Sequence, residues 1–283
     1  MATATAEPSV RLALTLKLKS NKAAARVAAT SGASYKAIVK EPGNVAQTDK
    51  WLDTIVPRIV KESDISARDA AAYYGVTRKL EIGDSSYTAT PSLGAIDDGV
   101  RGGLGELGMM QDKIKRIKSL DLPTDDEVVM LRSAQDDTAK NIVATTIRYA
   151  QAGGRKTIVD NSTNDKVAIG YVRVTSTKPC AFCAMLAGRG IEYRPYREGA
   201  FDKSNARFEG EGNAKVHNSC GCSLKPVFTK DDAILKRNGD FANMWLEWGA
   251  GGGGKAAIKR FTKGYEYWAK TGEYKSWEWA NGE

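Results

Sequence analysis

The spacing of apolar residues divides the chain into a helical first part, a short mixed segment and a helical last part. Pro57 predicts a kink or a break in one of the first helices, and the glycine-rich residues 94–108 predict a loop. Residues 1–122 are therefore expected to form a mainly helical N-terminal region. Within it, helices are expected over residues 49–62 and 66–80, and a short basic helix over residues 109–119. Residues 12–18 alternate like a strand, but the alanines that follow favour a helix over residues 10–29.

The best-marked helix begins in the middle of the chain. Thr124 and Glu127 fit the spacing of a capping box, in which each side chain bonds the backbone of the other residue. Apolar or small residues then repeat at helical spacing as far as Tyr149. The pair Gly153-Gly154 predicts the end of this helix.

Two strands are expected after that helix. Residues 167–175 are rich in β-branched side chains and predict one strand, and residues 224–228, which follow Cys222, are expected to form a second. Together with the preceding helix they predict a small α+β module over residues 123–228. The tail, residues 229–283, is expected to be helical, mainly over residues 230–248 and 255–270.

The tail holds most of the tryptophans. Tryptophans on short helices often dock on a partner or pack back on the body of the same chain, and both interpretations stay open here. Five of the six tryptophans of the chain lie in this tail: Trp245, Trp248, Trp268, Trp277 and Trp279.

Composition and charge narrow the class of protein. The chain has 283 residues, of which 42% are hydrophobic, which is enough for a substantial core. No apolar run approaches the roughly 20 residues that span a bilayer, so we expect a soluble protein. The first residues lack the basic start and apolar core of a signal peptide, so we expect synthesis in a reducing cytosol.

The net charge of +8 is compatible with contact to packaged DNA or to an acidic partner. Basic residues near the start of the chain could form an arm that grips DNA or another subunit. The alternative is a solvated helix face. These residues are Arg11, Lys17, Lys19, Lys22 and Arg26.

All four cysteines and the only histidine lie within residues 179–228. They form two tight clusters, and thiolate and imidazole are the ligands that zinc prefers in structural sites. We expect one structural zinc ion held by Cys180, Cys183 and His217 and by either Cys220 or Cys222. The sequence does not choose between the last two. The five residues are Cys180, Cys183, His217, Cys220 and Cys222.

These cysteines have three possible uses other than metal binding. Two disulfides are disfavoured in a reducing cytosol. A thioredoxin-like redox pair at Cys180 and Cys183 would leave the second cluster without a role. The cysteines could also be plain buried apolar residues. With the metal, the predicted fold class is α+β: a mainly helical N-terminal part, a small zinc-stapled α+β module and a helical, Trp-rich tail.

The sequence around the cysteines resembles the Mu F-like minor head proteins of tailed bacteriophages, most closely the branch in phages of actinobacteria. The resemblance is carried by Arg173-Val174, by Cys180-Ala-Phe-Cys183-Ala-Met-Leu-Ala-Gly188-Arg-Gly190, by the His217–Cys222 cluster and by Pro226-Val-Phe228. It covers residues 128–228 best. Some members of that family are fused to, or described as, capsid maturation proteases.

The resemblance implies a minor capsid protein for head morphogenesis, assembled in the host cytoplasm and located in the virion head near the portal. It implies the phage portal or the major capsid protein as partner and a role around DNA packaging, while the charge leaves non-specific DNA contact open. Neither a membrane nor a small-molecule substrate is expected.

Catalytic motifs are incomplete. Residues 249–255 fit a phosphate-binding loop, but Ala256 stands where the loop needs Ser or Thr. His217 cannot serve both as metal ligand and as general base. A structural protein is therefore favoured over an enzyme. The alternative is a zinc-dependent hydrolase or nuclease with an open metal position, in which a glutamate acts as base. The candidates for that base are Glu192, Glu198, Glu209 and Glu211.

Overall fold

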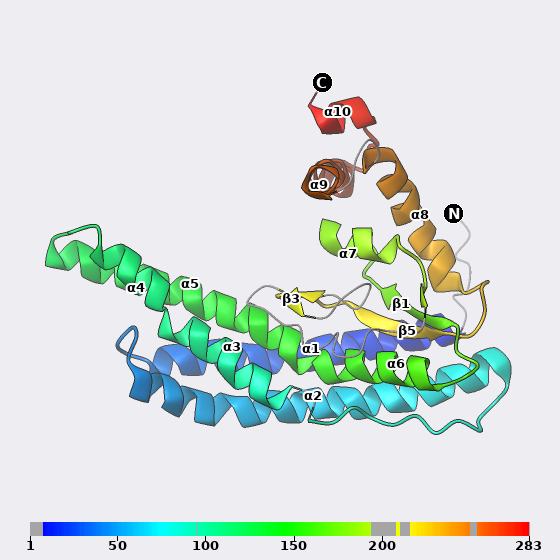
Figure 1. Cartoon of the computed structure of the whole chain (residues 1–283), viewed down its shortest axis with the longest axis horizontal. Helices are drawn as coiled ribbons and strands as arrows, with labels where there is room; N and C mark the ends of the chain where they lie inside the picture. The colour runs from blue at the N-terminus through cyan, green and yellow to red at the C-terminus, as the bar shows by residue number, and fades with distance from the viewer. Residues whose placement is uncertain (1–7, 95, 194–207, 210–215, 250–253, 283) are drawn as a thin grey trace.

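Three long helices run side by side and form the base of the molecule: α1 (Pro8–Ile38), α2 (Val45–Ile82) and α5 (Thr124–Ala150) (Figure 1). The computed structural model describes residues 8–94, 96–193, 208–209, 216–249 and 254–282. Above the helices lies a small antiparallel sheet, and the C-terminal helices lie beyond it. The chain is thus an α+β protein with helical ends, as predicted.

Helix α1 confirms the helix predicted near the start of the chain and extends beyond it. Its buried residues include Val10, Ala13, Ala24, Ala28 and Tyr35, which recur at helical spacing. The helix packs against α2 and α5. The basic stretch expected to form an arm is therefore one helix of this bundle.

Helix α2 is continuous, so the break expected at Pro57 is absent. A proline inside a helix removes one hydrogen bond and costs about 3 kcal/mol. Apolar residues buried on both sides of it, among them Trp51, Ile55 and Ile59, offset that loss by holding one stripe against the core. The two helices predicted over residues 49–62 and 66–80 are one.

Residues 94–108, expected to be a loop, instead supply most of helix α3 (Asp97–Met109). Its glycines allow close packing: a Cβ on Gly103 would lie 2.4 Å from the hydroxyl of Tyr149. Val100 and Leu104 of the same helix are fully buried. Tertiary packing thus overrides the low helix propensity of glycine. Helix α4 (Gln111–Lys118) follows and confirms the helix predicted there.

The ends of α5 differ from the prediction. Pro123 occupies the N-cap position and no side chain caps the helix, so the expected capping box is not formed. At the other end α5 stops at Ala150, and the glycine pair lies inside the next helix, α6 (Ala152–Asn164). A Cβ on Gly153 would lie 2.4 Å from the carbonyl oxygen of Ser63 in α2. These glycines therefore serve helix packing and not helix termination.

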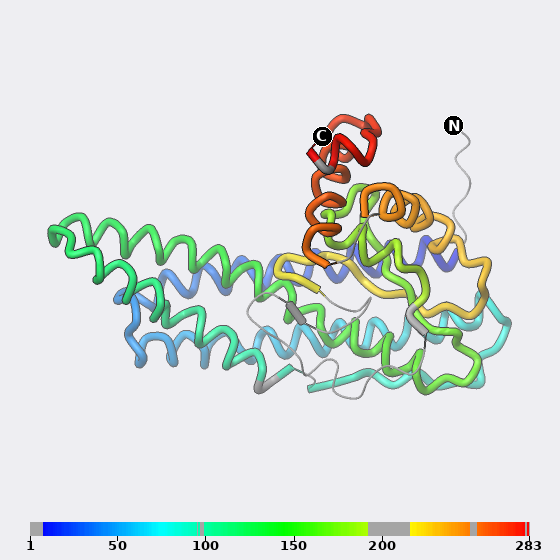
Figure 2. The backbone as a smooth tube through the Cα atoms, turned by 45° about the horizontal axis from the view of Figure 1, so that its top comes forward, coloured from blue at the N-terminus to red at the C-terminus, as the bar shows by residue number. Residues whose placement is uncertain are grey.

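Helices α4 and α5 form a hairpin that projects beyond the turn between α1 and α2 in both views (Figures 1 and 2). The buried residues of α5 begin only at Thr138, so the outer half of the helix is solvent-facing. Because α5 also packs along α1, the predicted regions 1–122 and 123–228 share one helical bundle.

The sheet has the strand order β2-β1-β5, with β1 (Gly170–Val174) antiparallel to both neighbours. β1 and β5 (Ser223–Val227) confirm the two predicted strands. β2 spans Glu192–Tyr193, and a separate pair joins β3 (Phe208–Glu209) to β4 (Val216–His217). Apolar side chains of the sheet pack with α1, α2 and α6 in one core.

The tail folds against the sheet domain. Helices α8 (Ala233–Trp248) and α9 (Gly254–Thr271) confirm the predicted pair, and α10 (Trp277–Asn281) follows. Trp248 is fully buried, and its indole nitrogen donates a 2.7 Å hydrogen bond to the carbonyl oxygen of Lys275. These helices share a core with the short helix α7 (Ala181–Ala187), so Trp248 packs within the chain. No described helix combines the length and apolarity that crossing a membrane requires.

Candidate metal centre

The first pair of cysteines lies at the start of α7. Cys180 is the N-cap residue and Cys183 lies in the first turn, so one helical turn brings both thiols to the same end. The connection from β1 is fixed by Tyr265 of α9, whose hydroxyl donates a 2.7 Å hydrogen bond to the carbonyl oxygen of Pro179. The tail thus helps to place the first two candidate ligands.

The second cluster lies between β4 and β5. Ser219 has a φ of 63°, in the left-handed region, and the amide of Cys220 donates a 3.1 Å hydrogen bond to the carbonyl oxygen of His217. This turn brings His217 and Cys220 to one side. Cys222 is buried at the entry to β5.

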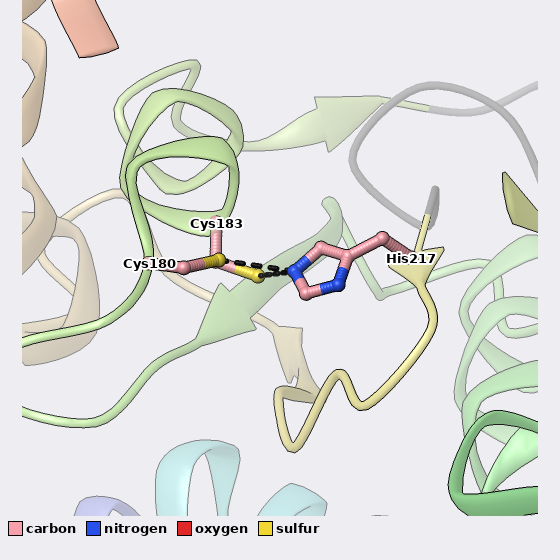
Figure 3. A group of neighbouring side chains, drawn as sticks. All are labelled: Cys180, Cys183 and His217. Carbon is pink, nitrogen blue, oxygen red and sulfur yellow. Dashed lines mark hydrogen bonds between the residues drawn. The ribbon is translucent and has the colours of Figure 1, made fainter. Parts of the chain in front are cut away.

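Cys180 and Cys183, at the start of α7, point toward His217 of β4 (Figure 3). The Cys180 Sγ lies 3.0 Å and the Cys183 Sγ 3.8 Å from Nε2 of His217. On its other side the Cys183 Sγ lies 3.5 Å from the Sγ of Cys220. Ligands of one tetrahedral zinc lie about 3.8 Å apart for two sulfurs and about 3.5 Å apart for sulfur and nitrogen. These three separations therefore fit a metal ion.

His217 presents the correct nitrogen. Its Nδ1 lies 2.5 Å from the carbonyl oxygen of Asn218, which only accepts hydrogen bonds, so Nδ1 carries a proton. Nε2 is left to face the sulfurs. Metal-binding histidines are commonly fixed in this way, by a hydrogen bond from the nitrogen that does not bind the metal. Phe182 packs edge-on against the ring at 5.4 Å and limits its rotation.

Charge is already unevenly distributed over the metal-free cluster. Hydrogen bonding to Cys183 and then to His217 lowers the pKa of Cys180 to about 4. Hydrogen bonding to Cys183 and to Cys222 also lowers the pKa of Cys220. The bond to Cys180 raises the pKa of His217 to about 9. At neutral pH the Cys180 thiolate therefore faces the His217 imidazolium, and a metal ion held by these residues would take the place of the imidazolium proton.

All five predicted site residues come together, in two groups that share Cys183: Cys180, Cys183 and His217, and Cys183, Cys220 and Cys222. Within each group the ligand atoms lie within 4.8 Å of one another. The four cysteines are free thiols, so the alternative of two disulfides is not observed. Glu192 and Glu209 lie in short strands, and Glu198 and Glu211 lie outside the described residues.

Sequence reasoning did not assign a role to Arg173. Its side chain is buried beside the sulfurs of Cys183 and Cys220. The available signal was a charged residue in the middle of an otherwise apolar strand, since a buried arginine requires a counter-charge or several hydrogen bonds.

The fold and the cluster together define an α+β protein with a candidate metal centre built from cysteine and histidine. Residues 9–247 match the model of the VG15 protein family, so the chain belongs to that family, a family of viral gene products, which points to a bacteriophage protein. The match runs from α1 into α8 and includes all five site residues. No curated protein and no solved structure matches the chain.

Proposed function

We propose that this chain is a minor head protein of a tailed bacteriophage, in which one structural zinc ion fixes the sheet domain. The observation that carries the proposal is the family match over residues 9–247, because it assigns the bundle and the cluster together to a viral protein. The resemblance of the cysteine region to Mu F-like minor head proteins supports the narrower assignment.

Zinc is the metal that the ligand set favours. Three thiolates and one imidazole are typical of closed structural sites, whereas catalytic sites keep one position for water. We propose Cys180, Cys183 and His217, whose ligand atoms form one group, as three ligands, and Cys220 of the second group as the fourth, since the Sγ atoms of Cys183 and Cys220 lie 3.5 Å apart. Binding of one ion would draw the two groups together around Cys183. The ion would connect α7 to the turn before β5, two segments that are more than 30 residues apart in the chain.

The zinc-dependent hydrolase or nuclease remains the rival function. It requires a metal-bound water within reach of a base. Among the described residues, one candidate group consists of two cysteines and His217 and the other of three cysteines. X-ray absorption of the zinc-loaded protein separates the two: three sulfurs and one nitrogen favour the structural role, and a bound oxygen favours the catalytic one.

The partner that we propose is the portal or the major capsid protein, with non-specific DNA contact as an additional interaction supported by the net charge of +8. Peptide mass spectrometry of purified phage particles tests the location. We expect the chain in DNA-filled heads and in heads separated from their tails. If the chain is present in infected cells but absent from purified heads, the proposed function is wrong. Elemental analysis of the same protein, with Cys180→Ser as control, tests the zinc.

A further inference from the structure

Arg173 lies in the middle of β1, where its backbone pairs with Leu224 of β5. The residue is 0% exposed. From α8, the side-chain amide of Asn238 donates a 3.0 Å hydrogen bond to the carbonyl oxygen of Arg173. The strand position is therefore fixed by the sheet and by α8 together, and the side chain is held below the metal cluster.

The guanidinium reaches both cysteine clusters at once. Its Nη1 lies 3.9 Å from the Sγ of Cys220 and 4.0 Å from the Sγ of Cys183. These two sulfurs come from different segments of the chain. Nη1 of a guanidinium carries two N–H donors, one for each sulfur, and lies at the end of a longer side chain than the ammonium of lysine.

The net charge of the proposed centre explains why a buried cation would contact its sulfurs. Zinc brings two positive charges and three thiolates bring three negative charges, while the imidazole ligand is neutral. The loaded centre therefore carries one net negative charge, and its Cys183 and Cys220 side, which faces Arg173, is buried. One buried guanidinium neutralises it. Arg155 is also buried and acts electrostatically on Cys220, but Arg173 is the cation whose Nη1 contacts the two sulfurs.

We propose that Arg173 is the buried counter-charge of the metal centre and that it favours a divalent ion held by three thiolates and one imidazole. The inference rests on the proposed zinc site. Arg173 is a positioning residue: its N–H groups hold the sulfurs of Cys183 and Cys220, and its charge stabilises them as thiolates.

The test measures zinc affinity of the full chain by competition with a chromogenic chelator under reducing conditions. Arg173→Met removes the charge and retains much of the volume. We expect at least about a tenfold loss of affinity, as for hydrogen bonds to charged groups elsewhere.

The matched control is Arg78→Met. Arg78 is also buried and is paired with Asp165 at 2.8 Å, but it lies in α2, outside the cluster. This control should leave zinc affinity within about threefold of the unmutated chain, as expected for a distant site. An equal loss in both variants would assign Arg173 a general stabilising role and overturn the inference.

A second test, in a chain that carries Cys180→His, separates the effect of the charge of Arg173 from its other effects. Cys180→His replaces one thiolate ligand by a neutral imidazole, so the loaded centre becomes neutral without Arg173. In this background Arg173→Met should change zinc affinity by less than about threefold, whereas in the unmutated chain the loss is about tenfold. If the same loss appears in both backgrounds, Arg173 does not act as counter-charge.

Arg173→Lys covers the case in which Arg173→Met does not fold. Lysine keeps the charge, but its ammonium is one bond closer to the backbone than Nη1 and does not reach both sulfurs. The sulfur-to-metal charge-transfer band of the Co²⁺-loaded protein should therefore shift; an unchanged band contradicts the inference. Failure of the proposed site itself looks different, because the unmutated, fully reduced chain would then retain no zinc.

Discussion

The backbone amide of Ser219 donates a 2.8 Å hydrogen bond to the carbonyl oxygen of Ala144. Ser219 lies in the turn between two candidate metal ligands, and Ala144 lies in α5 of the helical bundle. The turn is therefore attached to the bundle on one side and, in the proposed centre, to α7 on the other. Loss of the metal is expected to affect this attachment first.

Removal of zinc should lower the stability of the chain. A chelator is expected to lower the Tm by at least about 10 °C, because a structural zinc site contributes several kcal/mol and about 1 kcal/mol shifts the Tm of a protein of this size by about 2–4 °C. Differential scanning calorimetry with and without added Zn²⁺ measures the effect.

Hydrogen exchange locates that effect. Exchange should accelerate at residues 181–187 and 216–222 and remain slow in the centre of α2. A uniform acceleration over the whole chain, or an unchanged Tm, would argue against a local metal site.

The fourth ligand can be assigned with a matched pair of variants. Cys220→Ser should abolish tight zinc binding, because its sulfur is one of the four proposed ligands. Cys222→Ser should retain one zinc ion per chain, because that thiol is proposed to lie beside the centre without binding it. Metal content after gel filtration gives both answers, and a reversal of the two results would make Cys222 the ligand.

Cys180 should react with alkylating reagents at unusually low pH in the metal-free chain. Its pKa is lowered to about 4, so the reactive thiolate persists as the pH falls from neutral and is lost only as the pH approaches 4. In the unfolded chain the thiolate is lost below a pH of about 8.5. Mass spectrometry of the alkylated peptide over a pH series compares the two states.

Bound zinc should suppress this alkylation at every pH at which the metal stays bound. A midpoint near 8 or 9 in the folded, metal-free chain would show that the contact between Cys180 and His217 does not form.

The crossing of α2 and α6 predicts opposite effects for two Gly→Ala substitutions. Gly153→Ala places a Cβ 2.4 Å from the carbonyl oxygen of Ser63 and should destabilise the chain by about 1–3 kcal/mol. Gly75→Ala, inside α2 with nothing within 4 Å of the added Cβ, should stabilise it by about 0.5–1 kcal/mol. Chemical denaturation of the zinc-loaded protein measures both, and equal effects would contradict the close crossing.

The helices, the two main strands and the grouping of the cysteines with His217 could be predicted from spacing along the chain, whereas the metal itself stays a prediction. Cys180 and Cys183 share one helical turn, and the periodicity of α1 follows from its own residues. The break predicted at Pro57 and the loop predicted around Gly103 are wrong. The local preferences of these residues are overridden by partners distant in sequence, the core beneath α2 and the ring of Tyr149.

The position of Arg173 below two sulfurs and the hydrogen bond that orients His217 depend on how the two halves of the site meet. Neither relationship is encoded in a spacing, so only the folded chain reveals them.

A straight helix resists compression, so α5 fixes the distance between its two ends. Ala144, bonded to the ligand-bearing turn, and Thr124, at the outer end of the same helix, are separated by about 30 Å at the usual rise per residue. A partner bound at the outer end would therefore be kept at a constant distance from the proposed metal centre, whatever that partner is.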